Sequence, residues 1–244
     1  RSEIWGMLCA GNPEKAAYYA QMDSSIDHSG FSVEAEMFLS ACEAEAFFES
    51  DIKTILKRAI SIFPENSSIV HLYNKVADFT IDCTPEIAKH KIKSYFGDAD
   101  FTSAPQNIAF TIHTLLNNPV KLESVMDAIN MGHDSDCISA TVGALLGTII
   151  GYKNLDAQWK KFVGNELLIS PGIVGIDSAS TVSELAQQTA QAGVSFAELL
   201  NNCEILDVPP FEKTAFKKKT CSVVQLDLKK DSQKYQLTFK ITNN

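Results

Sequence analysis

Two aspartates stand two residues apart in residues 130–137, which read NMGHDSDC. Carboxylate oxygens are the ligands that Mg²⁺ and similar hard cations prefer. The glycine of this segment permits a turn that aims Asp134 and Asp136 at one point, and we call residues 132–137 the Asp turn. Because Asp is also a favoured first residue of a helix, the segment predicts either a metal site or a helix cap.

The residues behind the Asp turn must hold it in place. Residues 138–150 form an apolar run that predicts a buried helix. Gly143, Gly147 and Gly151 recur there at every fourth position, although each glycine weakens an isolated helix by roughly 1 kcal/mol relative to Ala. We therefore expect the glycines to permit close approach of another helix backbone, in a central helix of an all-α bundle.

Composition and charge limit the function classes. The chain has 244 residues, 45% of them hydrophobic and 21% charged, as in a globular protein with one large domain or one domain and an extension. The net charge is −9, with +4 on residues 205–244 and −13 on the preceding 204 residues. An acidic body argues against nucleic-acid binding. The longest apolar run is too short to cross a bilayer, so no membrane partner is expected.

The cysteines form neither a zinc pattern nor a compact disulfide framework, because no two of them make a C-x-x-C pair. They are Cys9, Cys42, Cys83, Cys137, Cys203 and Cys221. We expect free thiols and a cytoplasmic location. The first residue is Arg1 rather than Met, and no signal segment is recognisable, so we expect a chain that begins partway through a longer protein or has lost its start.

Periodicity and capping residues predict a series of helices followed by two strands. The helices are expected at about residues 13–20, 32–48, 51–63, 67–82, 84–96, 105–116, 121–129, 138–150, 157–163 and 181–193, and the strands at 222–228 and 235–241. The fold class is therefore mainly α, with a helical domain over residues 1–205. Residues 206–244 are expected to form a linker at Val208-Pro209-Pro210 and a β-strand extension.

Other polar residues have ordinary explanations. The helix predicted at residues 32–48 carries an acidic face, for which solvation is the simplest reading. That face consists of Glu34, Glu36, Glu43 and Glu45. His28 lies in a predicted loop, where a histidine binds either a ligand or its own backbone. Structural roles are expected for the three histidines within helical patterns, which are His71, His90 and His113.

The Asp turn, with residues 140–143 and Gly147, resembles the C-terminal metal motif of the ADP-ribosylglycohydrolase family. The similarity is to the branch in which this motif, Gly-x-Asp-x-Asp, ends in Cys. Residues 25–30 and 36–38 resemble the His-containing loop and the following helix of the same family.

Further segments extend the resemblance to roughly residues 1–195. Residues 4–6 and 11–17 are similar to the family's mid-chain segment, and Trp159 with residues 183–186 to its closing segment. The resemblance implies an orthogonal all-α helical bundle of the ADP-ribosylglycohydrolase type. No Thr-Asp-Asp or Ser-Asp-Asp, the family's first metal motif, occurs in the 244 residues, so the resemblance also implies a chain without the N-terminal part.

The resemblance assigns metal ligands at the Asp turn. The family bundle holds two Mg²⁺ ions, with Mn²⁺ as another possible ion, and Asp134 and Asp136 would be both ligands and catalytic residues. Cys137 stands where the family has a hydroxyl ligand, and a thiol is a poor ligand for Mg²⁺. Either the role of Cys137 is structural, or Thr141 or Ser139 supplies the missing oxygen.

The implied reaction is hydrolysis of a glycosidic bond between ribose C1″ and a protein side chain or small group. Its transition state would have oxocarbenium character. The substrate would be free or protein-linked ADP-ribose, contacted by His28, His133 and Glu36. The alternative is a catalytically incomplete member that acts as a binding or structural protein, which the missing first motif and Cys137 favour. A third reading is an unrelated helical protein in which Asp134 only caps a helix.

Overall fold

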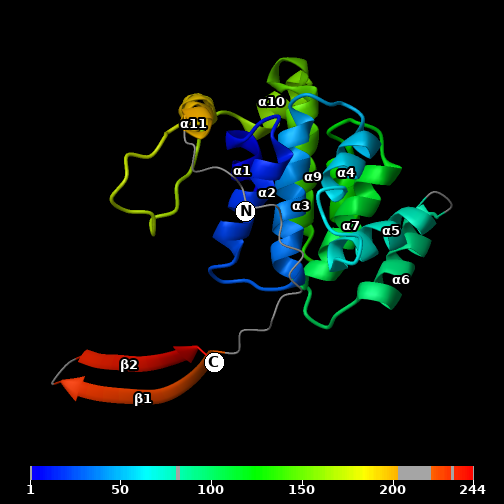
Figure 1. Ribbon diagram of the computed structural model, residues 1–244. Helices are drawn as coiled ribbons and strands as arrows, with labels where there is room; N and C mark the ends of the chain where they lie inside the picture. Colours follow the sequence, from blue (N-terminus) through cyan, green and yellow to red (C-terminus); the bar gives the residue numbers. More distant parts are fainter. Residues whose placement is uncertain (1, 81–82, 203–220, 232–233, 244) are drawn as a thin grey trace. The chain divides into compact units, whose positions relative to one another are not determined.

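The computed structural model describes residues 2–80, 83–202, 221–231 and 234–243 (Figure 1). The chain divides into two units, residues Arg1–Pro210 and Phe211–Asn244. The predicted linker at residues 208–210 lies outside the described residues. In the described part of the chain, no helix is both long and apolar enough to cross a membrane.

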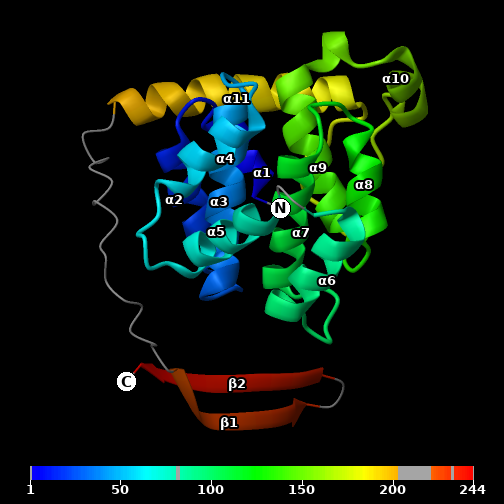
Figure 2. The ribbon, with the colours of Figure 1, turned by 90° about the vertical axis from the view of Figure 1, so that its right-hand side faces the viewer.

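The first unit is a helical bundle, and the predicted mainly α fold is confirmed (Figures 1 and 2). Its helices are α1 (Glu3–Leu8), α2 (Pro13–Ser24), α3 (Phe31–Ala46), α4 (Ile52–Ile60), α5 (Ser68–Thr80), α6 (Pro85–Phe96), α7 (Ala104–Asn117), α8 (Ser124–Met131), α9 (Ser135–Ile150), the 3-10 helix η1 (Tyr152–Asn154), α10 (Ala157–Val163) and α11 (Val182–Asn202). Side-chain caps begin two of the predicted helices: the Asn12 side chain accepts from the Lys15 amide at α2, and the Asp51 side chain accepts from the Thr54 amide at α4.

The second unit contains strands β1 (Cys221–Asp231) and β2 (Lys234–Asn243), which pair antiparallel. The register runs from Cys221 opposite Asn243 to Asp231 opposite Lys234, with an irregularity between Val223 and Gln225. Both strands are longer than the sequence predicts, because charged and polar residues at their inner ends continue the pairing.

The centre of the bundle is formed by α3 and α7. Ten consecutive residues of α7, from Gln106 to Leu115, are buried, and ten residues of α3 are buried as well. In α9 only a stripe of four residues is buried, which consists of Ile138, Val142, Leu145 and Leu146. The prediction that the glycine-spaced helix is central is therefore wrong.

The glycines of α9 do not permit a close helix contact. A Cβ placed on Gly147 would meet no atom within 4 Å, and one on Gly143 would make an ordinary contact with Val125. The close approach instead occurs at Gly6, in a helix that the sequence analysis does not predict. A Cβ on Gly6 would lie 2.5 Å from the Glu43 Cβ and 2.7 Å from the Ser40 carbonyl oxygen. Gly6 thus lets α1 pack directly against α3.

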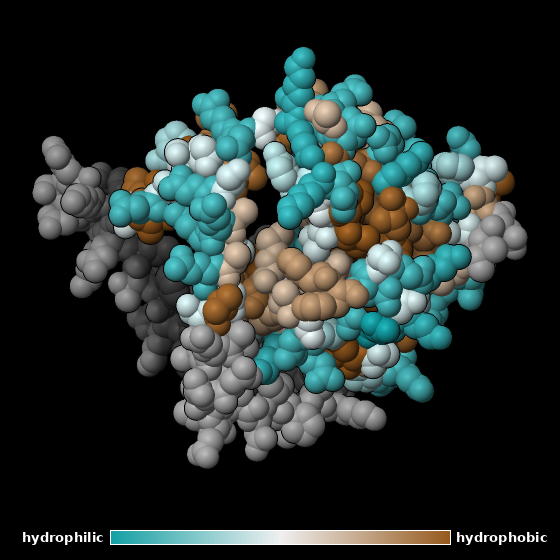
Figure 3. Space-filling model, turned by 90° about the horizontal axis from the view of Figure 1, so that it is seen from above, coloured by the Kyte–Doolittle hydropathy of each residue, from teal (hydrophilic) through white to brown (hydrophobic). Residues whose placement is uncertain are grey.

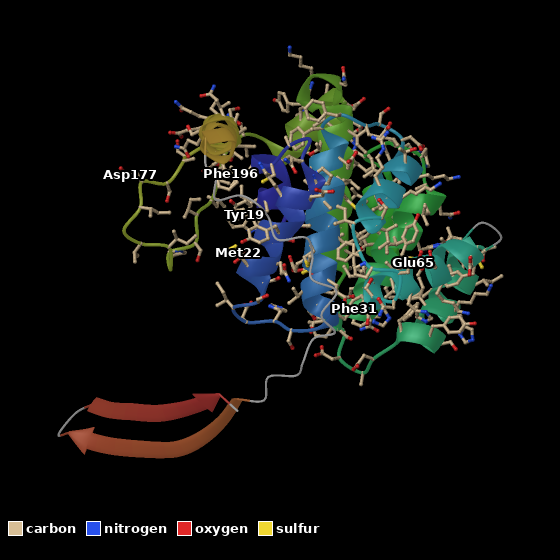
Figure 4. All side chains as sticks on the ribbon, in the orientation of Figure 1. Tyr19, Met22, Phe31, Glu65, Asp177 and Phe196 are labelled. Atoms are coloured by element: carbon tan, nitrogen blue, oxygen red, sulfur yellow. The ribbon has the colours of Figure 1, made fainter. Side chains whose placement is uncertain are left out.

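Helix α11 packs on the bundle through an aromatic cluster. Phe196 meets Tyr19 of α2 edge to face, with ring centroids 4.9 Å apart, and lies 6.4 Å from the Trp5 ring of α1. Figure 4 shows Phe196 and Tyr19 facing one another below α11. Most other side chains of residues 182–196 are exposed, so this cluster is the main contact of that part of α11 with the bundle.

The segment that follows α9 contributes little to the core. Phe162, Leu168 and Val174 are 83, 86 and 81% exposed. Seen from above, the surface of the molecule has brown apolar areas among the teal polar ones (Figure 3). The bundle core therefore depends on residues before 150, the part of the chain that also carries the Asp turn.

Candidate metal centre

The Asp turn is a sharp reversal between α8 and α9. Gly132 ends α8 with a φ of +77°, and His133 follows with a φ of +60°, the one positive φ of a non-glycine residue in the described chain. Side chains disfavour this region of φ, although His tolerates it better than most residues. Two successive residues in this region turn the backbone abruptly, so that Asp134 and Asp136 emerge at the start of α9.

The turn brings three potential ligand atoms together. One atom each from Asp134, Asp136 and Cys137 lie within 4.8 Å of one another, and no other comparable group of His, Cys, Asp and Glu occurs among the described residues. Asp134 occupies the cap position of α9, but its side chain makes no cap hydrogen bond. Asp134 therefore lacks the side-chain bond of a helix cap, and the Asp136 carboxylate beside it is exposed.

The thiol of Cys137 is exposed and lies beside the Asp134 carboxylate. Its hydrogen bond to Asp134 is the largest cause that raises its pKa, and burial and the charges of Asp134 and Asp136 add to the effect. The thiol therefore stays protonated and donates to the Asp134 carboxylate. A protonated thiol is a poor ligand for a hard cation, so the carboxylates of the group fit such an ion and the sulfur does not.

The two candidate hydroxyls have other partners. Thr141 lies one helical turn after Cys137 and donates to the Glu3 carboxylate, 2.9 Å away. The Ser139 hydroxyl donates to the backbone carbonyl of Asp136 at 3.1 Å. An oxygen ligand from either residue would require it to give up this bond.

His133 stacks on an aromatic ring and lies near two lysines. Its ring stacks on Phe110 of α7, with centroids 5.1 Å apart and planes at 22°. Partial burial is the largest cause that lowers its pKa, and the nearby charges of Lys93 and Lys89 in α6 lower it further. The imidazole is therefore neutral near pH 7. The two lysines stand four residues apart on one helix, but no local pattern in the sequence places them beside His133.

The acidic face predicted for α3 is not a solvated face. Glu43 is 1% exposed, and its carboxylate accepts the Thr148 hydroxyl of α9. Burial is the main cause that raises the pKa of Glu43 to about 7. The other three glutamates make contacts of different kinds: Glu34 accepts from the Ile69 amide, Glu45 pairs with Arg58, and Glu36 has a buried Oε2 without a hydrogen bond.

His28 and Glu36 remain predictions as substrate contacts. His28 is in the loop between α2 and α3, and its Nδ1 lies 2.7 Å from the Asp27 carboxylate. A shallow hollow elsewhere, between α5 and α6, does not include any of the predicted site residues. It is lined by Lys75, Asp78, Phe79, Lys91 and Tyr95.

The fold and the site together define a helical bundle with an acidic turn of the metal-binding type. A family model described as ADP-ribosylglycohydrolase matches residues 1–194 of the 244. The chain therefore belongs to the ADP-ribosylglycohydrolase family, whose hydrolases are generally metal-dependent and act on ADP-ribose-containing substrates. No curated protein and no solved structure matches the chain. The cytoplasmic location stays a prediction.

Proposed function

We propose that this chain uses Asp134 and Asp136 to hold a divalent cation, Mg²⁺ or Mn²⁺, and thereby hydrolyses ADP-ribosyl glycosidic bonds. The observation that carries the proposal is the grouping of two carboxylates at the start of α9, with the Asp134 side chain making no cap bond. Family membership supports the reaction class. A bound ion of this kind would supply Lewis acidity and a template for ribose hydroxyls and water.

The residues of the turn have distinct tasks in this proposal. Asp136 is exposed and Asp134 is half-buried. The two carboxylates can therefore bind a cation at the protein surface, where a substrate can also reach that cation. Breaking a glycosidic bond develops positive charge on the ribose. His133, neutral and stacked on Phe110, would offer a ring face and one nitrogen acceptor to the ribosyl group.

The second candidate is a binding or structural protein without catalytic activity. Two features favour this candidate. The Cys137 thiol stays protonated beside Asp134, and the group of Asp134, Asp136 and Cys137 offers oxygen ligands from only two residues. Mg²⁺ requires six oxygen ligands, so water, substrate or further residues would have to supply most of them.

Titration calorimetry with Mg²⁺ and Mn²⁺ separates the candidates. We compare the 244-residue chain with Asp134→Asn/Asp136→Asn and with a control, Asp127→Asn, which removes an exposed acid of α8. The proposal expects binding that the double variant loses and the control retains. It also expects metal-dependent release of ADP-ribose from an ADP-ribosylated peptide. Metal binding without release would favour the binding protein, and equal binding by all three proteins would refute the assignment of the ligands.

A further inference from the structure

Helix α6 carries a net positive charge, whereas the helical unit as a whole is acidic. It contains Lys89, Lys91 and Lys93 against a single acid, Glu86, whereas residues 1–204 together carry −13. An acidic body repels phosphate groups at long range. A ligand that carries phosphates therefore needs a locally positive surface where it binds.

Two of these lysines lie beside the Asp turn. The Lys89 Nζ is 3.3 Å from the position that a Cβ on Gly132 would take. Lys93 follows one helical turn later on the same side of α6, and both charges act on the His133 ring. Gly132 thus leaves space for the Lys89 ammonium immediately before the two aspartates.

Lys91 lies on a different side of the same helix and provides a contrast. Its Nζ is 5.4 Å from the centroid of the Phe79 ring of α5, and it lines the hollow between α5 and α6. Residues two apart on a helix do not share a face. The charges of α6 are therefore divided between the Asp turn and the α5 side.

Among the residues that the structure describes, neither lysine beside the turn forms an ion pair. Within the described chain, the ion pairs involve Asp27 with His28 and the glutamates at 45 and 49 with Arg58, so neither Lys89 nor Lys93 is paired. Lys89 is half-buried and Lys93 is exposed. The two charges are thus available to an anion, and they are not used to neutralise Asp134 or Asp136 by direct contact.

Resting on the proposed function, we propose that Lys89 and Lys93 bind the diphosphate of a nucleoside-diphosphate ribosyl substrate whose ribose faces Asp134 and Asp136. An ammonium donates strong, charge-assisted hydrogen bonds to phosphate oxygens. The arrangement separates two tasks: the carboxylates of α9 attract a cation, and the lysines of α6 attract the phosphates next to it. It also selects against ribosyl compounds without phosphate.

The first test needs no metal. Inorganic pyrophosphate is titrated by calorimetry in EDTA into the 244-residue chain, into Lys89→Gln/Lys93→Gln and into the control Lys91→Gln. We expect the unmodified chain and the control to bind with equal affinity, which weakens as salt is raised, and the double variant to bind about tenfold more weakly or worse. Pyrophosphate binding that is absent from the unmodified chain, or unchanged in the double variant, overturns the inference.

A second titration, with Mn²⁺, separates this inference from the proposed function. If the lysines serve phosphates, their replacement leaves Mn²⁺ binding within about twofold. Absence of Mn²⁺ binding by all three proteins, together with lysine-dependent pyrophosphate binding, would refute the metal proposal and support the phosphate site. If replacement instead strengthens Mn²⁺ binding about tenfold and leaves pyrophosphate binding unchanged, the lysines act only as counter-charges and the inference fails.

Discussion

The buried Glu43 makes the stability of the bundle depend on pH. Its pKa rises from an ordinary 4.5 to about 7 in the folded chain, mainly by burial and partly by the charge of Glu3, although the hydrogen bond from Thr148 opposes the shift. Folding therefore favours the protonated carboxyl. Between pH 4.5 and pH 7 the folded chain binds more protons than the unfolded chain, so the free energy of unfolding falls as pH rises.

The magnitude follows from the shift. A difference of about 2.5 pKa units corresponds to about 3 kcal/mol of stability, present below pH 4.5 and lost above pH 7. Glu43→Gln keeps the shape of the side chain and removes the charge. We expect this variant to be about 3 kcal/mol more stable than the unmodified chain at pH 8 and within about 1 kcal/mol of it at pH 5.

Urea unfolding followed by circular dichroism at pH 5, 6, 7 and 8 measures this difference. Glu65→Gln is the control, because Glu65 is an exposed carboxyl of the loop before α5 (Figure 4). If the stability difference between Glu43→Gln and the unmodified chain is constant from pH 5 to pH 8, the assignment of a raised pKa to Glu43 is refuted.

Other substitutions test the packing and the site. Gly6→Ala should destabilise the chain by about 2 kcal/mol, because the new methyl overlaps α3, whereas Gly147→Ala should stabilise it by up to about 1 kcal/mol; equal effects in thermal unfolding would contradict the packing described. Cys137→Ser should raise Mg²⁺ affinity severalfold in calorimetry, since a hydroxyl is a harder ligand than a thiol, and unchanged affinity would remove residue 137 from the ligand set. Phe196→Ala should cost about 2 kcal/mol and speed hydrogen exchange in α11 rather than in α3.

Rules of periodicity and helix capping, which use only residues close in sequence, predicted most of the helices and the position of the Asp turn. Asn12 and Asp51 cap helices where the sequence predicts, because a cap depends on residues within one turn. The same rules did not predict α1, because six residues are too few to show a helical pattern. The role of Gly6 depends on its contact with α3, which is distant in sequence. These rules also assigned Glu43 to a solvated face, since a charged residue is rarely buried.

The residue types at the Asp turn were determined by the sequence alone: two carboxylates at a fixed spacing, a glycine before them and a helix behind them. Whether the Asp134 side chain would cap the helix was decided by the fold, because the positive φ of His133 and its stacking on Phe110 set the direction of the backbone. The fold alone also placed Lys89 beside Gly132. Contacts between side chains distant in sequence depend on how helices pack, and no local pattern contains that information.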